Sequence, residues 1–265
     1  MRAPLTAVAA LVLMSGCDAI EQLSPNLFTI EDDIELGAQL AEEIASKPKE
    51  YGKILDPDDP ANAEAYDHLQ RVTDAVIDSE EIRYRDEFVW QLHIIDDDEV
   101  LNAFAAPGGY IYVYTGLIHY LEVEDHFAGV MGHEIAHADQ RHSTQQLTKA
   151  YGVSTLLGVV FGSDPGVIAQ VASGLLSLQF SRTDEAEADE FSVYYLCDTD
   201  YAANGTAGFF EKLSEEGGVG VPEFLSTHPS PDNRVEDINN LAEDLGCSLD
   251  PNPNADWDGF KSSLP

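Results

Sequence analysis

The stretch GVMGHEIAHADQRH, residues 129–142, carries two histidines four positions apart, with a glutamate directly after the first. Side chains at positions i and i+4 of an α-helix lie on one face, so His133 and His137 can direct imidazole nitrogens to a single ion. Neutral imidazole is a good zinc ligand, and a catalytic zinc keeps one of its four positions open for water. Glu134 is then free to act on a water that the metal activates. The stretch therefore predicts a catalytic zinc centre on a helix.

A third protein ligand must come from outside this helix. The metzincin continuation H-E-x-x-H-x-x-G-x-x-H fails, because Gln140 and Ser143 stand at its last two positions. His142 comes one residue early and is rotated away from the face of His133 and His137, so we interpret it as a structural residue. The remaining possibility is the gluzincin arrangement, in which a glutamate on a second helix completes the site.

The stretch SRTDEAEADEF, which begins at Ser181, predicts such a helix. Ser181 can cap it, and Asp184 three residues later is typical of a capping box. Glu185 and Asp189 share one face, whereas Glu187 points elsewhere. We assign Glu185 as the third zinc ligand and Asp189 as the acceptor that orients a ligand histidine through its other ring nitrogen. Taken alone, the segment also fits a solvated acidic helix, and the upstream motif favours the site.

These motifs resemble those of peptidase family M48, the group of zinc metallopeptidases that includes HtpX, BepA and the CAAX prenyl proteases. Its members look like H-E-x-x-H followed by S-R-x-x-E-x-x-A-D, which stands here at residues 181–189. NAFAAPGGYIYVYTGL, residues 102–117, is similar to the strand that precedes the zinc helix. THPSPDNR, residues 227–234, is similar to a His-Pro motif with a downstream arginine. The resemblance extends from about residue 31 to residue 245.

The resemblance implies a mainly α member of the α+β class. We expect a gluzincin-type zinc metallopeptidase domain over residues 31–248, with a small β-sheet next to the H-E-x-x-H helix and one catalytic zinc ion. The chain ends soon after the His-Pro motif, so we expect no helical-repeat domain of the kind that some periplasmic relatives carry. His126 is a departure, because many relatives have an acidic residue at that position.

His228 precedes Pro229, which biases it towards an extended conformation and holds it in a loop. The resemblance implies that His228 is catalytic, as a donor that stabilises the oxyanion opposite the metal. It equally allows a latch, in which the neutral imidazole takes the open zinc position. Arg234 would then bind the substrate backbone or brace this loop. The plain alternative is a loop histidine that faces solvent.

A turn is predicted at Pro107-Gly108-Gly109, between the strand-like stretches LNAFAA and YIYVYTG. A proline near a strand is typical of a sheet edge, and an exposed edge lets an extended peptide add a strand. We therefore expect Asn102, Gly108 and Gly109 to bind substrate. The alternative is a simple hairpin corner.

The amino end, MRAPLTAVAALVLMSGCDAI, has a minimal basic region, an apolar run and small residues before Cys17. This pattern predicts a secretory signal over residues 1–16. Met14-Ser15-Gly16-Cys17 looks like a bacterial lipobox, which implies that Cys17 carries lipid and that residues 17–30 form a tether. Cleavage at a nearby site and an uncleaved anchor are the alternatives. Asp18 resembles an inner-membrane retention signal, and the outer membrane stays open.

Two cysteines remain after Cys17. An exported chain places Cys197 and Cys247 in an oxidising compartment, so they could form one disulfide. Cys197 ends the predicted ligand helix and Cys247 follows the last predicted helix, residues 232–245. Their proximity does not follow from the sequence, and two free thiols are the alternative.

The charge balance excludes one class of partner. The chain has 13 Lys and Arg against 49 Asp and Glu, a formal net charge of -36. Nucleic-acid binding needs a positive surface, and nothing basic clusters here, so we expect no nucleic-acid partner. The acidic strings at residues 56–60 and 95–100 fit no EF-hand loop and are interpreted as solvated turns.

Other elements follow from periodicity. Helices are predicted over residues 31–48 and 62–79 and a strand over residues 86–95. Residues 151–180 are almost uncharged, and we expect a buried or interfacial helical hairpin, because each half is too short to cross a bilayer. The tail over residues 249–265, rich in Pro, Asn and Asp at its start, is expected to be mobile.

The sequence thus predicts a zinc-dependent endopeptidase, tethered by lipid to a periplasmic membrane of a bacterial cell. Misfolded or misassembled envelope proteins are the substrates that the resemblance implies. A chaperone-like or scaffold lipoprotein, which holds extended chains on the sheet edge without cleavage, is the alternative. The general base Glu134 weighs against it. A structural zinc protein is disfavoured, because closed structural sites usually have four protein ligands and favour cysteine.

Overall fold

A computed structural model describes residues 26–162, 164–215, 222–229 and 233–265. The predictions of a signal peptide over residues 1–16, of lipid on Cys17 and of a retention signal at Asp18 lie outside the described residues. So does most of the predicted tether.

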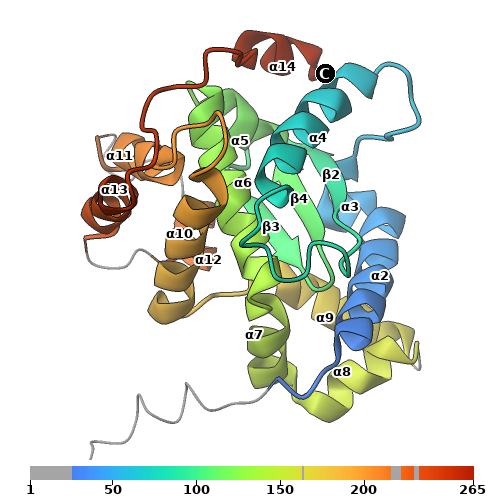
Figure 1. The fold of residues 1–265 in the computed structure, drawn as a ribbon. Coiled ribbons are helices and arrows are strands. Elements are labelled where there is room, and N and C mark those ends of the chain that lie inside the picture. The colour runs from blue at the N-terminus through green and yellow to red at the C-terminus, as the bar shows by residue number, and fades with distance from the viewer. Residues whose placement is uncertain (1–25, 163, 216–221, 230–232) are drawn as a thin grey trace, which may run out of the picture.

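One mixed sheet lies at the centre of the molecule, with the strand order β1-β2-β4-β3 (Figure 1). The parallel pair is β2 with β4, whereas β1 pairs with β2 and β3 with β4 in antiparallel fashion. The predicted strand over residues 86–95 begins later than expected, since Trp90 adopts a left-handed φ of 43° that interrupts the extended chain. The strands are β1 (Lys53–Ile54), β2 (Gln91–Asp96), β3 (Ala103–Ala106) and β4 (Tyr110–Tyr114).

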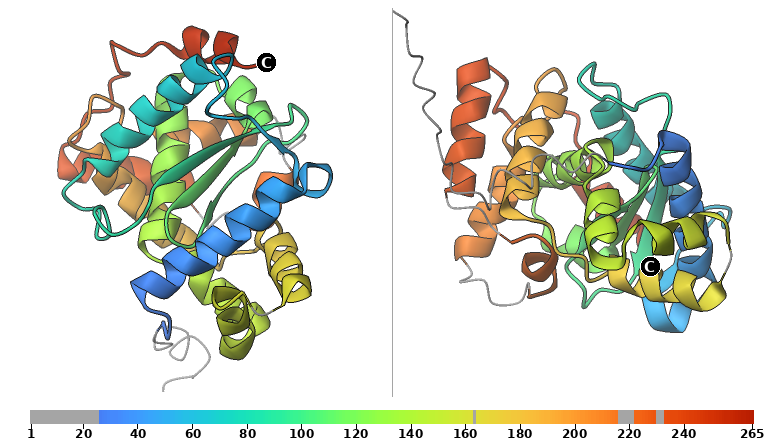
Figure 2. Two further views of the ribbon diagram at one scale, coloured as in Figure 1. Left: turned by 90° about the vertical axis from the view of Figure 1, so that its right-hand side faces the viewer. Right: turned by 90° about the horizontal axis from the view of Figure 1, so that it is seen from below.

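Helices make up most of the rest of the chain, which confirms the mainly α, α+β class. They cover both faces of the sheet, with α2 on one side and α4 and α6 on the other (Figure 2). The helices are α2 (Ile30–Ser46), α3 (Pro48–Tyr51), α4 (Ala63–Ile77), α5 (Thr115–Tyr120), α6 (Glu124–Asp139), α7 (His142–Tyr151), α8 (Val153–Val160), α9 (Pro165–Leu175), α10 (Arg182–Leu196), α11 (Gly205–Glu215), α12 (Pro222–Thr227), α13 (Arg234–Leu245) and α14 (Trp257–Ser263).

Strand β4 shows why the sheet is buried on both sides. Its sequence YIYVY alternates between two core clusters, because successive side chains of a strand point to opposite faces. Ile111 and Val113 join the cluster formed with α4 and α6. Tyr112 joins the cluster formed with α2, α8 and α9 and stacks on Phe104 with ring centroids 4.5 Å apart. The sheet therefore forms a rigid support beneath α6.

Helix α6, which carries the H-E-x-x-H motif, is buried along almost its whole length. Glycine allows its neighbours to come close: a Cβ on Gly129 would lie 2.1 Å from the backbone nitrogen of Thr206 at the start of α11. Val123 is the N-cap of this helix. Asp125 lies in the first turn, where its Oδ1 accepts hydrogen bonds from the backbone N–H groups of Ala202 and Asn252.

Helix α10 begins as its sequence predicts. The side chain of Ser181 accepts a hydrogen bond from the backbone N–H of Asp184, and the Asp184 carboxylate accepts one from the backbone N–H of Ser181. This capping box is confirmed, and it fixes where the first turn of α10 starts. The register of Glu185 and Asp189 against α6 depends on that start.

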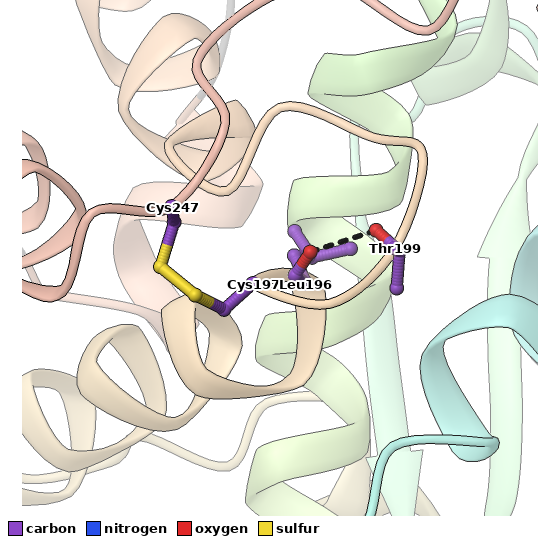
Figure 3. The surroundings of a disulfide bond; sticks show 4 residues. All are labelled: Leu196, Cys197, Thr199 and Cys247. Atoms are coloured by element: carbon purple, nitrogen blue, oxygen red, sulfur yellow. Dashed lines mark hydrogen bonds between the residues drawn. A yellow bond between two sulfur atoms is a disulfide. The ribbon is translucent and has the colours of Figure 1, made fainter.

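The far ends of α10 and α13 are joined covalently. Cys197 and Cys247 form a disulfide, with Cα atoms 4.9 Å apart (Figure 3). Cys197 is the C-cap of α10, and Cys247 follows the αL residue Gly246 that ends α13. The bridge therefore holds α13 beside the helix that carries the predicted third ligand.

The almost uncharged segment forms the hairpin of α8 and α9. These helices pack against α2 and α7 through buried residues such as Leu156, Val159 and Val171. Among the described residues, no single helix is both long and apolar enough to cross a membrane. The α8–α9 pair, bent by 112°, meets the length and composition criteria only when the two helices are taken together.

The carboxy end differs from the expected mobile tail. Helix α14 packs on α4, where Phe260 is fully buried and Trp257 is 7% exposed. The Trp257 indole N–H also donates a hydrogen bond to the backbone oxygen of Leu121. The apolar residues Trp257, Phe260 and Leu264 follow helical spacing, a signal that the neighbouring Pro, Asn and Asp residues obscured.

Substituting Phe260 by alanine tests this packing. Loss of a fully buried phenylalanine costs about 3–5 kcal/mol, because it removes apolar contacts and leaves a cavity. We expect urea unfolding of Phe260→Ala to show that loss, whereas the exposed neighbour Ser262→Ala should stay within about 0.5 kcal/mol of the parent. Equal stability of the two variants would show that the tail is mobile after all.

Candidate metal centre

The two motif histidines lie together on the buried face of α6. Their ring centroids are 4.6 Å apart, and the Nε2 atoms of His133 and His137 approach to 3.0 Å. Both side chains are at most 1% exposed. Helical spacing thus places two imidazole nitrogens at one point, as the sequence predicts.

Glu185 of α10 and His228, just after α12, complete the group. One ligand atom from each of the four residues lies within 4.8 Å of all the others. The individual separations are His133 Nε2 to Glu185 Oε2 3.5 Å, His137 Nε2 to Glu185 Oε1 3.4 Å, His228 Nδ1 to Glu185 Oε1 3.0 Å and His133 Nε2 to His228 Nδ1 3.4 Å.

These separations fit a tetrahedral ion. Bonds of about 2.0–2.1 Å to four nitrogen or oxygen ligands place neighbouring ligand atoms about 3.3 Å apart. The separations given above, from 3.0 to 3.5 Å, are close to that figure, with both carboxylate oxygens of Glu185 taking part, and all pairs in the group lie within 4.8 Å. Three imidazoles and one carboxylate are also donors that a zinc-like cation prefers. The group could therefore hold one metal ion.

The protonation states favour ligation at two of the four positions. Burial lowers the pKa of His137 well below its ordinary value, which keeps its imidazole neutral. Burial opposes ionisation of Glu185, but His228, His133 and His137 outweigh it and hold the pKa of Glu185 well below its usual range. Burial likewise opposes protonation of His133, yet hydrogen bonds to Asp189 and Glu185 raise its pKa to about 9, so metal binding must displace a proton there.

Glu134 lies beside this group in the position of a base. It is fully buried, and neither of its carboxylate oxygens has a hydrogen-bond partner among the described residues. Its Oε1 lies 3.5 Å from Nε2 of His228, which also lacks such a partner. Burial raises the pKa of the Glu134 carboxyl, so it can hold a proton more readily than an exposed glutamate.

Asp189 contacts the ring nitrogen of His133 that points away from the metal group, in agreement with the predicted orienting contact. Its Oδ1 lies 2.9 Å from Nδ1 of His133, which leaves Nε2 to face the metal group. Arg234 braces this acid through hydrogen bonds of 2.6 Å from Nε and 2.7 Å from Nη2, and Nη2 also reaches Glu185 Oε2 at 2.9 Å. Arg234 is only 4% exposed, and these hydrogen bonds hold the two acids of α10, which is neither the expected contact with substrate nor the expected bracing of the His228 loop.

His142, interpreted from the sequence as structural, contacts the second motif histidine. Its Nδ1 lies 2.9 Å from Nδ1 of His137, and its Nε2 lies 3.3 Å from Oε2 of Glu187. His142 is not rotated away from His137, as it would be in one continuous helix, because α6 ends before it: Arg141 adopts a left-handed φ of 62°, and a new helix starts. Glu187, which does not share a helix face with Glu185, is connected to His137 through the imidazole ring of His142.

The residues expected to bind substrate at the sheet edge do not lie on an exposed edge. All four residues of β3 are buried, and the Ser143 hydroxyl at the start of α7 donates a hydrogen bond to the backbone oxygen of Ala105. Asn102 is 2% exposed. Gly108 packs so closely on α2 that a Cβ would lie 2.7 Å from the Cα of Ile34. Tertiary packing by α2, α6 and α7, which the strand pattern does not contain, covers this region.

Gly108 and Gly109 form the turn between β3 and β4. Gly109 has a φ of 90° and Gly108 a φ of 78°, conformations that favour glycine. A Cβ on Gly109 would meet Phe88 and Trp90 at 3.0 Å. The predicted turn between β3 and β4 is therefore present, and its contacts fit the hairpin-corner alternative.

Aromatic rings close the metal group from solvent. Phe180 stacks on His137 at 3.9 Å, and Phe224 stacks on His228 at 4.5 Å. The backbone N–H of Phe180 donates to the backbone oxygen of Thr227 at 3.1 Å, which ties the two covering segments together. A polypeptide chain could reach the metal group only if these segments moved.

The model of a known protein family matches much of this chain. Residues 63–242 match the model of Peptidase family M48, a range that contains all four residues of the metal group.

Several curated proteins are similar to this chain. Mitochondrial metalloendopeptidase OMA1 of Saccharomyces cerevisiae is 28% identical over 215 residues, covering 74% of this chain and 62% of that protein. Its counterpart from Arabidopsis thaliana is 33% identical over 146 residues, 55% of this chain and 30% of that protein. Beta-barrel assembly-enhancing protease of Escherichia coli is 30% identical over 167 residues, 57% of this chain and 34% of that protein. The chain thus spans less than two thirds of the length of each.

Arg234 should be essential to the stability of this centre. Arg234→Met keeps much of the side-chain volume but leaves the buried carboxylates of Asp189 and Glu185 without their cation, which costs about 3–5 kcal/mol. We expect that loss in urea unfolding of the protein measured in the presence of a chelator. Arg85→Met is the control, because Arg85 is exposed and its pair with Asp86, at 3.7 Å, contributes at most about 1 kcal/mol. Similar losses in both variants would contradict the bracing role.

Proposed function

The chain belongs to peptidase family M48, and from this premise we propose that it is a zinc-dependent metalloendopeptidase of the bacterial cell envelope. One observation carries the proposal. Nitrogen atoms of His133 and His137 and a carboxylate oxygen of Glu185 converge on one point, and the carboxylate of Glu134, which has no hydrogen-bond partner among the described residues, lies beside them. A ligand set with an adjacent carboxylate base is the arrangement that metal-assisted hydrolysis of a peptide bond uses.

His133, His137 and Glu185 would hold the metal. Other side chains of the protein would transfer protons and keep the ligands in place. A bound zinc would supply a Lewis acid that polarises the scissile carbonyl and makes a water molecule more acidic. Glu134 accepts the proton that this water loses as its oxygen bonds to the carbonyl carbon. The same carboxyl then delivers the proton to the leaving nitrogen as the C–N bond breaks. Asp189 and Arg234 keep His133 in place throughout.

Misfolded or misassembled envelope proteins are the proposed substrates. Support comes from a relative whose name describes β-barrel assembly and from an amino end that resembles a bacterial lipoprotein signal. Lipid on Cys17 would tether the enzyme to a periplasmic membrane face, where such proteins are inserted. Helix α2 begins at Ile30, so the catalytic domain would begin where the proposed tether ends.

The alternative of a chaperone or scaffold that binds extended chains on the sheet edge has less support. That function requires an accessible edge strand, and β3 is buried beneath α6 and α7. A binding module also gives no role to Glu134, which is buried without a hydrogen-bond partner among the described residues and is therefore costly to maintain.

Glu134→Gln separates catalysis from metal binding. The amide keeps the shape of the side chain but removes the base, so we expect zinc to bind as in the parent while casein cleavage falls by at least ~100-fold. Glu185→Ala should instead lose zinc, measured by metal analysis after dialysis. Glu190→Gln, on the exposed face of α10, is the matched control and should change neither property.

Each outcome assigns one residue. Equal cleavage by Glu134→Gln and the parent would remove Glu134 from the mechanism. Full zinc occupancy in Glu185→Ala would place the third ligand elsewhere.

For His228, we propose the latch role. Its Nδ1 lies 3.0 Å from Glu185 Oε1 and 3.4 Å from His133 Nε2, so it stands among the ligand atoms rather than across a substrate from them. Its ring is fully buried against Phe224. In this arrangement the imidazole would take the fourth metal position and keep the protease inactive until the loop moves.

His228→Ala tests the latch by the sign of its effect. Removal of the latch should raise basal casein cleavage, with zinc retained through the other three ligands. Slower turnover with zinc retained, typically by 100-fold or more, would instead assign His228 as the oxyanion donor. An unchanged rate would show that it does neither. His119→Ala, at a half-exposed histidine on α5, is the control and should leave the rate unchanged.

A further inference from the structure

Each of the two histidines of α6 that face the metal group is connected by hydrogen bonds to a carboxylate of α10. We propose that His142 and Glu187 are positioning residues for His137. They fix which ring nitrogen of His137 carries its proton and so keep the other nitrogen ready for the metal. The inference rests on the proposed zinc site, and it concerns two residues that have no place in the ligand set.

With His142 in its neutral form, the donors and acceptors of these three side chains allow one direction of hydrogen bonding from His137 to Glu187. Glu187 accepts only, so Nε2 of His142, at 3.3 Å, must donate to it. The neutral ring of His142 then has a bare Nδ1, which accepts from Nδ1–H of His137 at 2.9 Å. His137 in turn presents a bare Nε2 to the metal group. The opposite tautomer of His142 would place the proton of His137 on Nε2 and block ligation.

The position of His142 is held independently of the metal group. Arg141, at the helix break, donates from Nε to Asp33 Oδ2 at 2.5 Å, and the Thr144 hydroxyl donates to Asp33 Oδ1 at 3.0 Å. Both contacts attach the first turn of α7 to α2. Because its backbone is anchored on either side, His142 directs its ring back towards α6 without help from a bound ion.

The two motif histidines are therefore supported in parallel ways. His133 contacts the carboxylate of Asp189 directly, at 2.9 Å. His137 reaches the carboxylate of Glu187 through one intervening imidazole. A carboxylate behind a ligand histidine fixes its tautomer and orientation, and loss of such a partner typically weakens metal binding by 10–100-fold.

Two substitutions at His142 distinguish positioning from packing. In His142→Asn, the amide oxygen can take the place of Nδ1 and still accept from His137. In His142→Gln, the amide lies near the place of Nε2, and nothing accepts from His137. We expect Zn²⁺ affinity, measured by competition with a chelator, to fall by about 10–100-fold in His142→Gln and to stay near the parent in His142→Asn. A role in packing alone predicts the reverse order, because glutamine fills more of the buried space.

A second pair of variants tests the same role without substitution of a buried residue. Glu187 has a half-exposed side chain, so Glu187→Ala should fold normally and lose about 10-fold in Zn²⁺ affinity. Glu190→Ala, one turn on along the exposed face of α10, should keep the affinity of the parent. Urea unfolding in chelator checks that all four variants fold.

The outcomes separate this inference from the function on which it rests. Parent affinity in both His142→Gln and Glu187→Ala would overturn the positioning role and leave the zinc site standing. A parent protein that binds no Zn²⁺ would overturn the proposed function, and the inference with it.

Discussion

Desolvation of charged groups between α6 and α10 is the constraint on which the rest of the structure depends. Glu185 and Asp189 lose their water there, and buried carboxylates are tolerated only when cations or hydrogen bonds replace it. Arg234 supplies that compensation from α13, and the Cys197–Cys247 disulfide holds α13 beside α10. The same acids orient the histidines of α6. Stability and ligand geometry therefore depend on one set of contacts.

Burial also explains why the centre is closed. The imidazoles and carboxylates are covered by Phe180 and Phe224, which stack on His137 and His228. A dry site strengthens every electrostatic interaction inside it, which favours catalysis but excludes a polypeptide substrate. The segments that carry the two phenylalanines are joined by the backbone hydrogen bond from Phe180 to Thr227 and by a hydrogen bond from the Gln179 side chain to the backbone oxygen of Ser226. In this account, the conformational change that admits substrate also removes His228 from the metal group.

Sequence reasoning succeeded where the determinants are local. The spacing within α6 and the capping box of α10 predict which faces carry His133, His137 and Glu185, because helix geometry is set by neighbouring residues. It failed where distant contacts decide. The break at Arg141 depends on Asp33, which is 108 residues away, so the ring of His142 could not be placed. The cover over β3 and the docking of α14 likewise come from packing between elements far apart in the chain.

The central claim is that a single zinc ion sits between α6 and α10. Diffraction data from crystals grown with zinc and recorded on both sides of the zinc absorption edge test it most directly. The account predicts one anomalous peak, about 2.0–2.2 Å from the Nε2 atoms of His133 and His137 and from a carboxylate oxygen of Glu185. A peak at other residues, or a fully formed group without a peak in zinc-saturated crystals, would contradict it.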